Sequence, residues 1–407
     1  MTARPIFRVL TCVLTFAIAS ADGMAGQKKE RSRPVKIGVL ASLTGSWSSL
    51  GQNTVAALRI AAKELKADSQ GRFQLVVHDT QLDPNLALAA IKKLHRKGVR
   101  IVIGPQSSSE LAMIKPFADS HKMLVISQGS TASSLAVAGD NIFRFCPNDK
   151  REALAIVALM RHDGISTLVP LWRNDAGNNG LHDSVTAEFE SGKGGIATEG
   201  YRYEPSTTDF STATSEIDKQ IQDLVANGTP EAEIAVYCAA FDEIVDIFHN
   251  AQSLPALTGV AWYGSDGVAL SAALVGDAPA AELAVKLGYP NPIFGLKDSL
   301  KHKWEPVSRA VEKRTGITPD AFALSAYDAL FVTSRALKKA KVERFPKFRR
   351  KFVRQANRYK GVTGSTALDA AGDRQSSDFD FWSIRSTDQG NSWIRTGTYH
   401  DGVLTVF

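Results

Sequence analysis

The chain has 407 residues, 44% of them apolar, which is more sequence than one packed core usually holds, so two domains are expected. Its formal net charge of +6 is too small to indicate nucleic-acid binding, and no nucleic-acid partner is expected. Three cysteines in a chain of this length do not form a disulfide framework, and we expect Cys146 and Cys238 to be reduced.

The amino-terminal segment has the pattern of a secretory signal peptide. Two arginines precede a run of apolar or small residues at 9–21, which is too short to span a bilayer. Ala19-Ser20-Ala21 matches a signal cleavage pattern, and Ala25-Gly26 is a second option. We therefore expect a signal peptide at 1–21, a disordered lead-in at 22–34, and a mature protein in the periplasm.

In the first part of the chain, short β-branched runs alternate with stretches of helical periodicity. Asp83-Pro84 places an N-cap before a proline at the first helical position. The alternation predicts right-handed βαβ units and a parallel sheet. The expected strands are 35–41, 73–78, 100–103 and 123–127, and the expected helices are a segment ending near 66, 84–97 and 110–119.

A second round of alternation follows an extended piece at 143–147, which ends in proline. Asn148-Asp149 is expected to cap a helix, so we place a domain crossover near 147–150. A return crossing is expected at 284–292, including Ala284–Leu287, and a hairpin near the carboxyl end. The remaining expected strands are 167–171, 201–203, 233–238, 260–263, 379–385 and 392–399, and the helices are 149–162, 180–190, 210–226, 242–252, 298–315, 320–341 and 345–359.

A serine cluster lies between a strand end and a helix start at Ile101-Val-Ile-Gly-Pro-Gln-Ser107-Ser108-Ser109. Hydroxyls and free backbone N–H groups converge at such a place, and the helix dipole favours an anion there. The alternative is that one serine simply caps the helix, and this stretch alone favours capping.

Taken together, the motifs resemble the leucine/isoleucine/valine-binding protein family, the type I periplasmic binding proteins that feed ABC importers. The resemblance covers about residues 35–400. It rests on Ile37-Gly-Val, Leu43-Thr-Gly45, Gly51, Asp79, Asp83-Pro84, Gly98-Val, Ile103-Gly-Pro105, Ser108-Ser109, Ile126-Ser127, Ser130-Thr131, Phe143-Arg144, Pro147-Asn-Asp149, Tyr203, Pro205, Asp209-Phe210 and Tyr327-Asp-Ala329.

The resemblance implies an α/β fold with two doubly wound parallel-sheet lobes, joined by three crossover strands and closing on a ligand. Lobe one would comprise 35–147 and 290–380, and lobe two 150–288 and 382–407. The third crossing, near Phe381-Trp382, is implied by the resemblance alone.

The resemblance also implies the binding residues for an amino acid. Ser108 and Thr131 would hold its carboxylate, the carbonyl of Gly129 would accept from its ammonium, and Asp266 would pair with that ammonium. The sequence departs from the family where Gly177 replaces an aromatic residue and Phe241 replaces a tyrosine. Some relatives carry a disulfide at positions that here are Leu82 and Ser107. Trp47, Leu50 and Phe241 are expected to face an apolar side chain.

The expected function is that of an extracytoplasmic solute-binding protein, which captures a branched-chain or other apolar amino acid and delivers it to an ABC permease. The alternatives are a ligand-sensing subunit, or a binder of amides or aromatic acids on the same fold. No nucleophile elbow or metal-ligand spacing is visible, so no enzymatic activity, metal or cofactor is expected, and the protein is expected to be a monomer.

Residues 338–360 contain eleven Lys or Arg and one acid. Phe345, Phe348, Phe352, Ala356 and Tyr359 recur within this stretch at helical spacing. We favour a solvated basic face on a packed helix, and a dock for a membrane partner or anionic lipid is the alternative.

Overall fold

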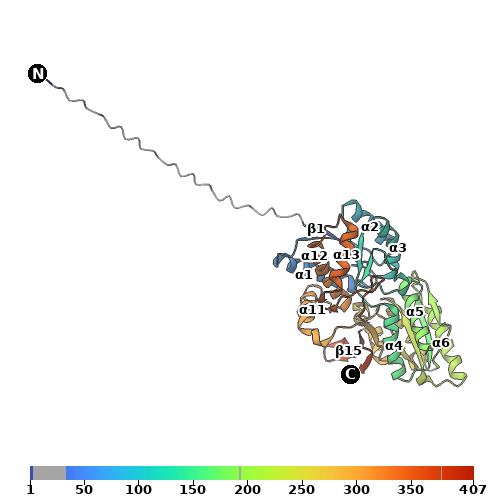
Figure 1. Ribbon diagram of the computed structural model, residues 1–407. Helices are drawn as coiled ribbons and strands as arrows, with labels where there is room; N and C mark the ends of the chain where they lie inside the picture. Colours follow the sequence, from blue (N-terminus) through green and yellow to red (C-terminus); the bar gives the residue numbers. More distant parts are fainter. Residues whose placement is uncertain (3–33, 192–193, 377) are drawn as a thin grey trace. The chain divides into compact units, whose positions relative to one another are not determined.

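The structure is a computed structural model, and it describes residues 1–2, 34–191, 194–376 and 378–407 (Figure 1). Residues 34–407 form one unit, which is the unit considered below. The predicted signal peptide and lead-in lie outside the described residues, apart from residues 1–2 and Pro34.

A five-stranded parallel sheet, in the order β2-β1-β3-β4-β5, organises lobe one. The chain runs outward from β1 in both directions, and a sheet with this order opens a crevice at the carboxyl ends of its strands. The strands are β1 (Val35–Ala41), β2 (Phe73–Asp79), β3 (Ile101–Ile103), β4 (Leu124–Ser127) and β5 (Ile142–Arg144), and the linking helices are α1 (Ser48–Ala67), α2 (Pro84–Arg96) and α3 (Ser108–Ser120).

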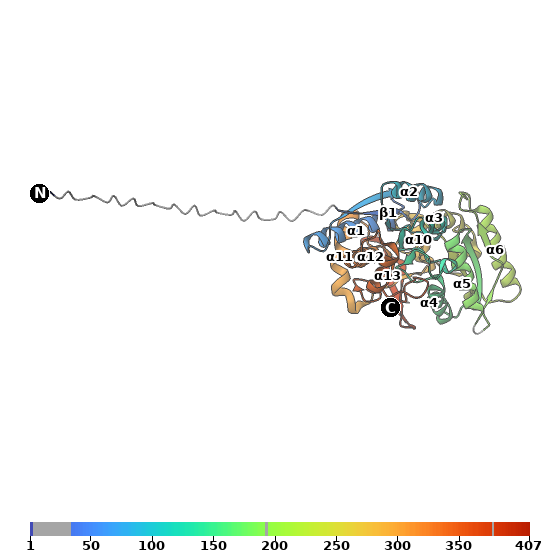
Figure 2. The same ribbon diagram turned by 45° about the horizontal axis from the view of Figure 1, so that its top comes forward.

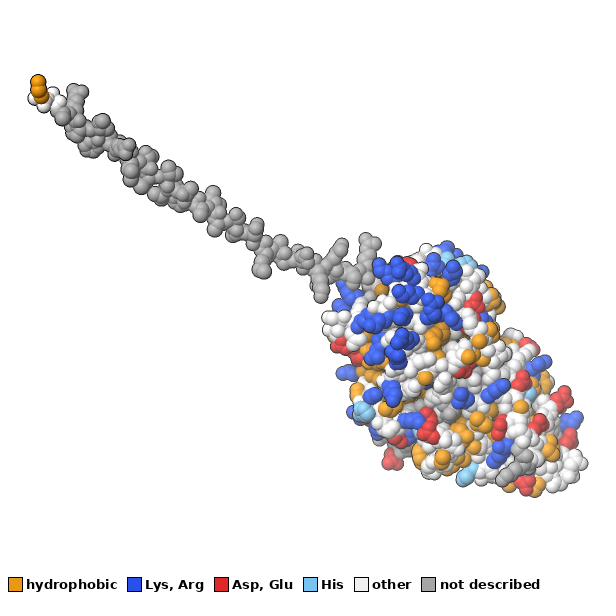
Figure 3. All heavy atoms as spheres, viewed as in Figure 1, with side chains coloured by type: hydrophobic (Ala, Val, Ile, Leu, Met, Phe, Trp, Pro, Cys, Tyr) orange, Lys and Arg blue, Asp and Glu red, His pale blue; other side chains and the backbone are white. Residues whose placement is uncertain are grey.

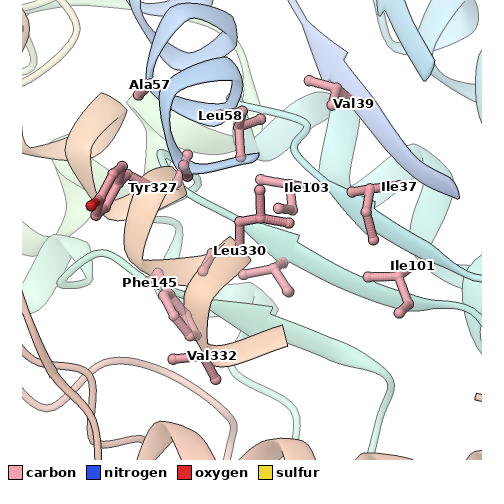
Figure 4. Close-up of a cluster of buried hydrophobic side chains, with 14 of the residues drawn as sticks. Ile37, Val39, Ala57, Leu58, Ile101, Ile103, Phe145, Tyr327, Leu330 and Val332 are labelled. Carbon is pink, nitrogen blue, oxygen red and sulfur yellow. The ribbon is translucent and has the colours of Figure 1, made fainter. Parts of the chain in front are cut away.

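Both faces of this sheet are covered by helices. Ile103 lies beside Leu58 of α1 and Leu330 of α12 (Ala321–Leu337) in a buried cluster on one face (Figure 4). Helices α11 (Lys301–Thr315) and α13 (Phe345–Ala356) join α1 and α12 on that side, as the two ribbon views show (Figures 1 and 2). Helices α2 and α3 cover the other face.

A second parallel sheet, in the order β10-β9-β6-β7 with β8 also pairing with β6, organises lobe two. Helices α4 and α5 pack on one face, and α6, α7 and α10 pack on the other. The strands are β6 (Thr167–Arg173), β7 (Ile196–Ala197), β8 (Tyr201–Tyr203), β9 (Ile234–Ala239) and β10 (Ala261–Tyr263). The helices are α4 (Asp149–His162), α5 (Ala176–Glu190), α6 (Ser211–Ala226), α7 (Ile244–Ala251), α8 (Pro255–Gly259), α9 (Ala272–Gly276) and α10 (Ala278–Leu287).

The carboxyl-terminal strands form a four-stranded antiparallel sheet in the order β11-β14-β15-β16. β14 shifts register between Phe381 and Trp382, where the third crossing is predicted. Before this strand, Asp373 pairs with Arg144 at the end of β5, whereas Phe381 lies in the core of the second sheet. The strands are β11 (Asn291–Phe294), β14 (Phe379–Thr387), β15 (Gly390–His400) and β16 (Val403–Val406), and β12 (Lys360–Gly361) pairs with β13 (Gly364–Ser365).

The predicted fold class of two doubly wound sheets is confirmed, and the exact lobe bounds stay a prediction. One predicted segment is wrong. Ala284–Leu287 was expected to be extended, but it forms the end of α10, which Asp277 caps and which ends at Gly288 in a left-handed conformation (φ 66°). The crossing strand is β11, a few residues later. The helix expected at 320–341 ends at Leu337.

Candidate ligand-binding site

Neighbouring serines after β3 have different roles. Ser107 caps α3, and its hydroxyl accepts from the backbone N–H of Glu110, whose carboxylate accepts from the Ser107 N–H at 3.1 Å. Ser108 is therefore free of capping. Its hydroxyl oxygen accepts from the Ala132 N–H and from the Ser130 hydroxyl, each at 3.1 Å. Both acceptor positions are thus used, which leaves the hydroxyl proton of Ser108 available to donate.

A buried arginine stabilises the loop after β4, which carries Gly129 and Thr131. Arg144 donates to the carbonyl oxygens of Ser130 and Ala132 and forms a buried ion pair with Asp373. These bonds fix the loop that faces Ser108. Thr131 is 5% exposed, and its carbonyl accepts from the Asp149 N–H at 3.0 Å, which joins this loop to the start of α4.

The three residues predicted to face the ligand side chain lie in one buried apolar cluster. The rings of Trp47 and Phe241 are 4.9 Å apart. A Cβ added at Gly129 would lie 3.3 Å from both Leu50 and Trp47, so this glycine lies directly against the cluster. Phe322 of α12 also belongs to the cluster, with its ring 6.3 Å from that of Trp47.

Gly177 lies elsewhere in the site. It follows the Asp175 cap of α5, and a Cβ built on it would lie 3.6 Å from the Ser108 hydroxyl oxygen. A large side chain at this position would therefore occupy the space in front of Ser108, and glycine leaves that space free.

Asp266 lies after β10, buried with 4% of its surface exposed. Its backbone N–H donates to Glu152 Oε1 at 3.1 Å, so two carboxyl groups lie together. One oxygen of each of these groups, and one of Asp149, makes no hydrogen bond within the described part of the protein. Unpartnered buried carboxylate oxygens are costly, and a bound cation would satisfy them.

The ionisation of this acidic cluster, which we define as Asp149, Glu152 and Asp266, follows from its burial. Burial, then repulsion from Asp149, raises the pKa of Asp266 to about 8. Burial raises the pKa of Asp149 to about 6, although hydrogen bonds from Thr131 and the Ser133 N–H oppose the rise. Burial and the two neighbouring carboxylates raise the pKa of Glu152 well above its ordinary value.

Sequence reasoning found Asp266 but missed Asp149 and Glu152, which it treated only as the start of a helix. It also missed Tyr237 and Ser265, whose hydroxyls are buried and make no hydrogen bond among the described residues. Burial raises the pKa of the Tyr237 hydroxyl, and the charges of Glu152, Asp266 and Asp149 raise it further. Tyr237 therefore lies near the acidic cluster.

Hydrogen bonds also join the two lobes at the rim of the site. The Trp47 N–H donates to Asp242 Oδ2 at 2.7 Å, and the Asp242 N–H donates to the Ser46 hydroxyl at 3.3 Å. Beside α5, the Ala176 N–H donates to the Ser109 hydroxyl at 3.1 Å. The loops that carry the candidate residues therefore contact the opposite lobe.

A pocket of about 630 Å³ opens beside the acidic cluster, between α4, α5 and the turn after Thr131. Lys150, Asn179, Gly180 and Ser133 are among its lining residues. A Cβ at Gly180 would lie 2.2 Å from Asp149 Oδ2, so the pocket reaches the edge of the cluster at this glycine.

Within the described ranges, no group of three or more His, Cys, Asp or Glu side chains is arranged to hold a metal ion. A search of the same residues found no helix with the length and apolar character needed to cross a membrane. Cys146 and Cys238 are both buried and free, which confirms the prediction for these two residues.

Comparison with known proteins agrees with this fold and places the chain in a family. The chain belongs to the family described as the receptor family ligand binding region, and the model of this family matches residues 53–387. An uncharacterized protein of Methanocaldococcus jannaschii is 26% identical over 317 residues, which cover 75% of this chain and 73% of that protein. The Leu/Ile/Val-binding protein BraC3 of Rhizobium johnstonii is 26% identical over 235 residues, covering 56% of this chain and 60% of the relative.

Solved structures with the same fold are type I periplasmic binding proteins. The branched-chain amino acid transporter substrate-binding protein LivJ of Streptococcus pneumoniae, in complex with isoleucine, has a TM-score of 0.70 and 18% identity, covering 89% of this chain and 100% of that one. A solute-binding protein of R. palustris in complex with benzoate has a TM-score of 0.69 and 17% identity, covering 89% and 96%. The resemblance stated from the sequence is thereby confirmed, and these neighbours are binding proteins of transporters rather than enzymes.

Proposed function

We propose that this protein is an extracytoplasmic solute-binding protein of an ABC importer, and that it captures a free amino acid between its two lobes. The observation that carries the proposal is the buried acidic cluster, in which each carboxyl group has an oxygen without a partner among the described residues. An ammonium group offers three donors and a positive charge, and it would supply what the cluster lacks.

The carboxylate of the same amino acid would bind at the loops of lobe one. Ser108 has a hydroxyl proton to donate, and it is the first residue of α3, where backbone N–H groups and the helix dipole favour an anion. We assign Thr131 to the same carboxylate, for which its hydroxyl would turn away from Asp149, and the Gly129 carbonyl to the ammonium. A ligand with both charges matches both sides of the site.

The side chain of the ligand would lie against Trp47, Leu50 and Phe241. None of the three is charged and all belong to one apolar cluster, which favours an aliphatic or aromatic side chain. The space that Gly177 leaves open lies in front of Ser108, where the carboxylate of the ligand would bind.

The partner of such a protein would be an ABC permease in the inner membrane, and the site of action the periplasm. This part of the proposal depends on the secretory signal predicted at residues 1–21. No catalytic step is proposed, and we expect the protein to act as a monomer.

An aromatic acid is the second candidate ligand, because the benzoate complex of R. palustris shares the fold and the apolar cluster here contains four buried aromatic residues. Such a ligand has no ammonium and would leave the acidic cluster unpaired. A sensory role with an amino acid as the signal remains compatible with the same site.

Thermal unfolding with added ligands tests the proposal. The midpoint should rise with one or more apolar amino acids and stay unchanged with benzoate, simple amides or plain carboxylic acids, since only a ligand that binds the native state stabilises it. Mass spectrometry of the purified protein would identify any ligand carried from the cell. Stabilisation by aromatic acids alone would instead favour the second candidate.

A further inference from the structure

The positive charge of the protein is concentrated in one segment. Residues 338–360 contain eleven basic residues and one acid, Glu343, which gives this segment a net charge of +10. The whole chain has a net charge of +6, so the remaining residues together carry −4. Because the positive net charge comes from only 23 of the 407 residues, it indicates a local function rather than a general property of the surface.

The structure places these charges on the outside of α13 and its flanking turns. Phe345, Phe348 and Phe352 face inward into the core of lobe one, while Lys347, Arg350 and Arg354 are exposed. Within the described residues, these three cations form no ion pair. Figure 3 shows Lys and Arg side chains gathered over the part of the surface where Figure 1 shows α12 and α13.

The basic surface continues along the amino-terminal edge of the first sheet. Ser334, near the end of α12, donates to the carbonyl of Gln70, just before β2. Arg349 of α13 donates to the carbonyl of Asp140, just before β5. Because parallel strands begin at one edge, the other residues at strand starts lie along the same edge. The basic residues among these are Lys36, Arg72, Arg100 and Lys122.

This edge is the one opposite the candidate ligand site. Helix α12 begins at the site, where Phe322 packs against Trp47, and it ends at the basic surface. Its 17 residues correspond to a length of roughly 25 Å. A partner bound at the basic surface would therefore leave the opening between the lobes uncovered.

We propose that this basic surface, defined as the exposed cations of residues 338–360 together with Lys36, Arg72 and Lys122, binds an anionic phospholipid bilayer. A protein partner is disfavoured because strong protein interfaces depend on aromatic and apolar anchors at their centre. Here the aromatic residues of α13 are buried, and none of the exposed large apolar residues of the described chain falls in this segment. A broad layer of cations that form no ion pair among the described residues instead suits a charged membrane plane.

Co-sedimentation with vesicles of the protein from residue 22 onward, without the predicted signal peptide, tests this inference. Binding to vesicles that contain phosphatidylglycerol should be clear at about 0.02 M salt and lost at about 0.5 M, because screening weakens exposed charges. Vesicles of phosphatidylcholine alone should not bind. The triple variant Lys347→Glu, Arg350→Glu, Arg354→Glu should bind at least tenfold more weakly than the wild type.

The matched control is Arg202→Glu, Lys219→Glu, Lys286→Glu, which changes the net charge equally at exposed cations of lobe two. This control should bind the vesicles like the wild type. Equal loss in both triple variants would mean that only net charge matters. Undiminished binding by the α13 variant would place the contact elsewhere in the protein. Either result overturns the inference. Retention of the protein on immobilised polyglutamate without binding to vesicles would also overturn it, because the surface would then bind an acidic protein. Thermal unfolding of each variant confirms that it is folded.

Discussion

The backbone N–H of Trp47 donates to the carboxylate of Asp242 at 2.7 Å, although the two residues are 195 positions apart and belong to different lobes. The other oxygen of Asp242 accepts from the Ser271 hydroxyl at 2.6 Å, which orients the carboxylate. Trp47 also packs its ring on Phe241, the residue before Asp242. One short loop of lobe one is thus held to one strand end of lobe two by both a hydrogen bond and ring contact.

Replacing Asp242 should weaken closure of the lobes. Asp242→Ala removes the acceptor for Trp47, so the closed state loses a charge-assisted hydrogen bond of about 1.5–3 kcal/mol. We expect a larger radius of gyration in small-angle scattering and weaker ligand binding, because fewer molecules are in the binding-competent state. Asp246→Asn, an exposed change on α7, is the control and should leave both unchanged. An unaltered scattering profile in Asp242→Ala would show that this contact does not control closure.

Asp266→Asn should change stability and binding in opposite directions. At pH 9 the ligand-free variant should be more stable by on the order of 1 kcal/mol, because one of several crowded buried charges is removed. Binding of the amino acid should weaken by about 2–5 kcal/mol, since the ammonium loses its partner. Chemical unfolding and calorimetry measure the two effects. Asp223→Asn, an exposed change on α6, should have neither, and a binding loss under about 0.5 kcal/mol in Asp266→Asn would make this residue incidental.

The pH dependence of stability should reflect the same carboxyl group. Because the folded state raises the pKa of Asp266 to about 8, it keeps a proton that the unfolded chain has already lost near pH 4. The folded state then binds more protons, so the free energy of unfolding falls as the pH rises through this window, by up to about 1.4 kcal/mol per pH unit for one group.

Asp149, with a pKa of about 6, should finish its contribution at lower pH, so the slope between pH 7 and 8.5 reflects Asp266 together with its neighbour Glu152, whose pKa is also raised. Urea unfolding of the ligand-free protein should show a shallower slope there for Asp266→Asn than for the wild type. Equal slopes would mean that Asp266 is already ionised at neutral pH. Amino-acid affinity should rise over the same range, because the ammonium prefers the ionised carboxylate.

Cys146 and Cys238, two of the three cysteines of the chain, should be unreactive in the native protein. Cys146 and Cys238 are fully buried, and burial raises the pKa of each thiol, so little thiolate is present. A colourimetric thiol reagent should label neither residue without denaturant and both in its presence. Labelling of Cys146 under native conditions would indicate that the lobes open far enough to expose the first crossover, beside which it lies.

The sequence was sufficient to predict the alternation of strands and helices, because buried parallel strands read as short β-branched runs between helical periods. It was insufficient for Ala284–Leu287, since a four-residue apolar run suits either a strand or a buried helix end. The Asp277 cap before this run was the available signal for a helix.

The candidate site was only partly predictable for a related reason. The sequence showed three serines, but only packing decides that Ser107 caps the helix and leaves Ser108 to face the loop of Thr131. Asp149 and Glu152 lie three residues apart at a helix start, which local rules treat as capping. Their contact with Asp266, more than a hundred residues later, depends on how the two sheets meet and leaves no local pattern.

The most direct test of an amino acid as ligand compares leucine with 4-methylpentanoic acid, the same molecule without its amino group, by calorimetric titration of one protein preparation. If the acidic cluster receives an ammonium, leucine should bind at least about a hundredfold more tightly, a difference of about 2.7 kcal/mol. The preference should largely disappear in Asp266→Asn. Equal affinity of the wild type for the two compounds, or tighter binding of the acid, would contradict the assignment of an amino acid to this site.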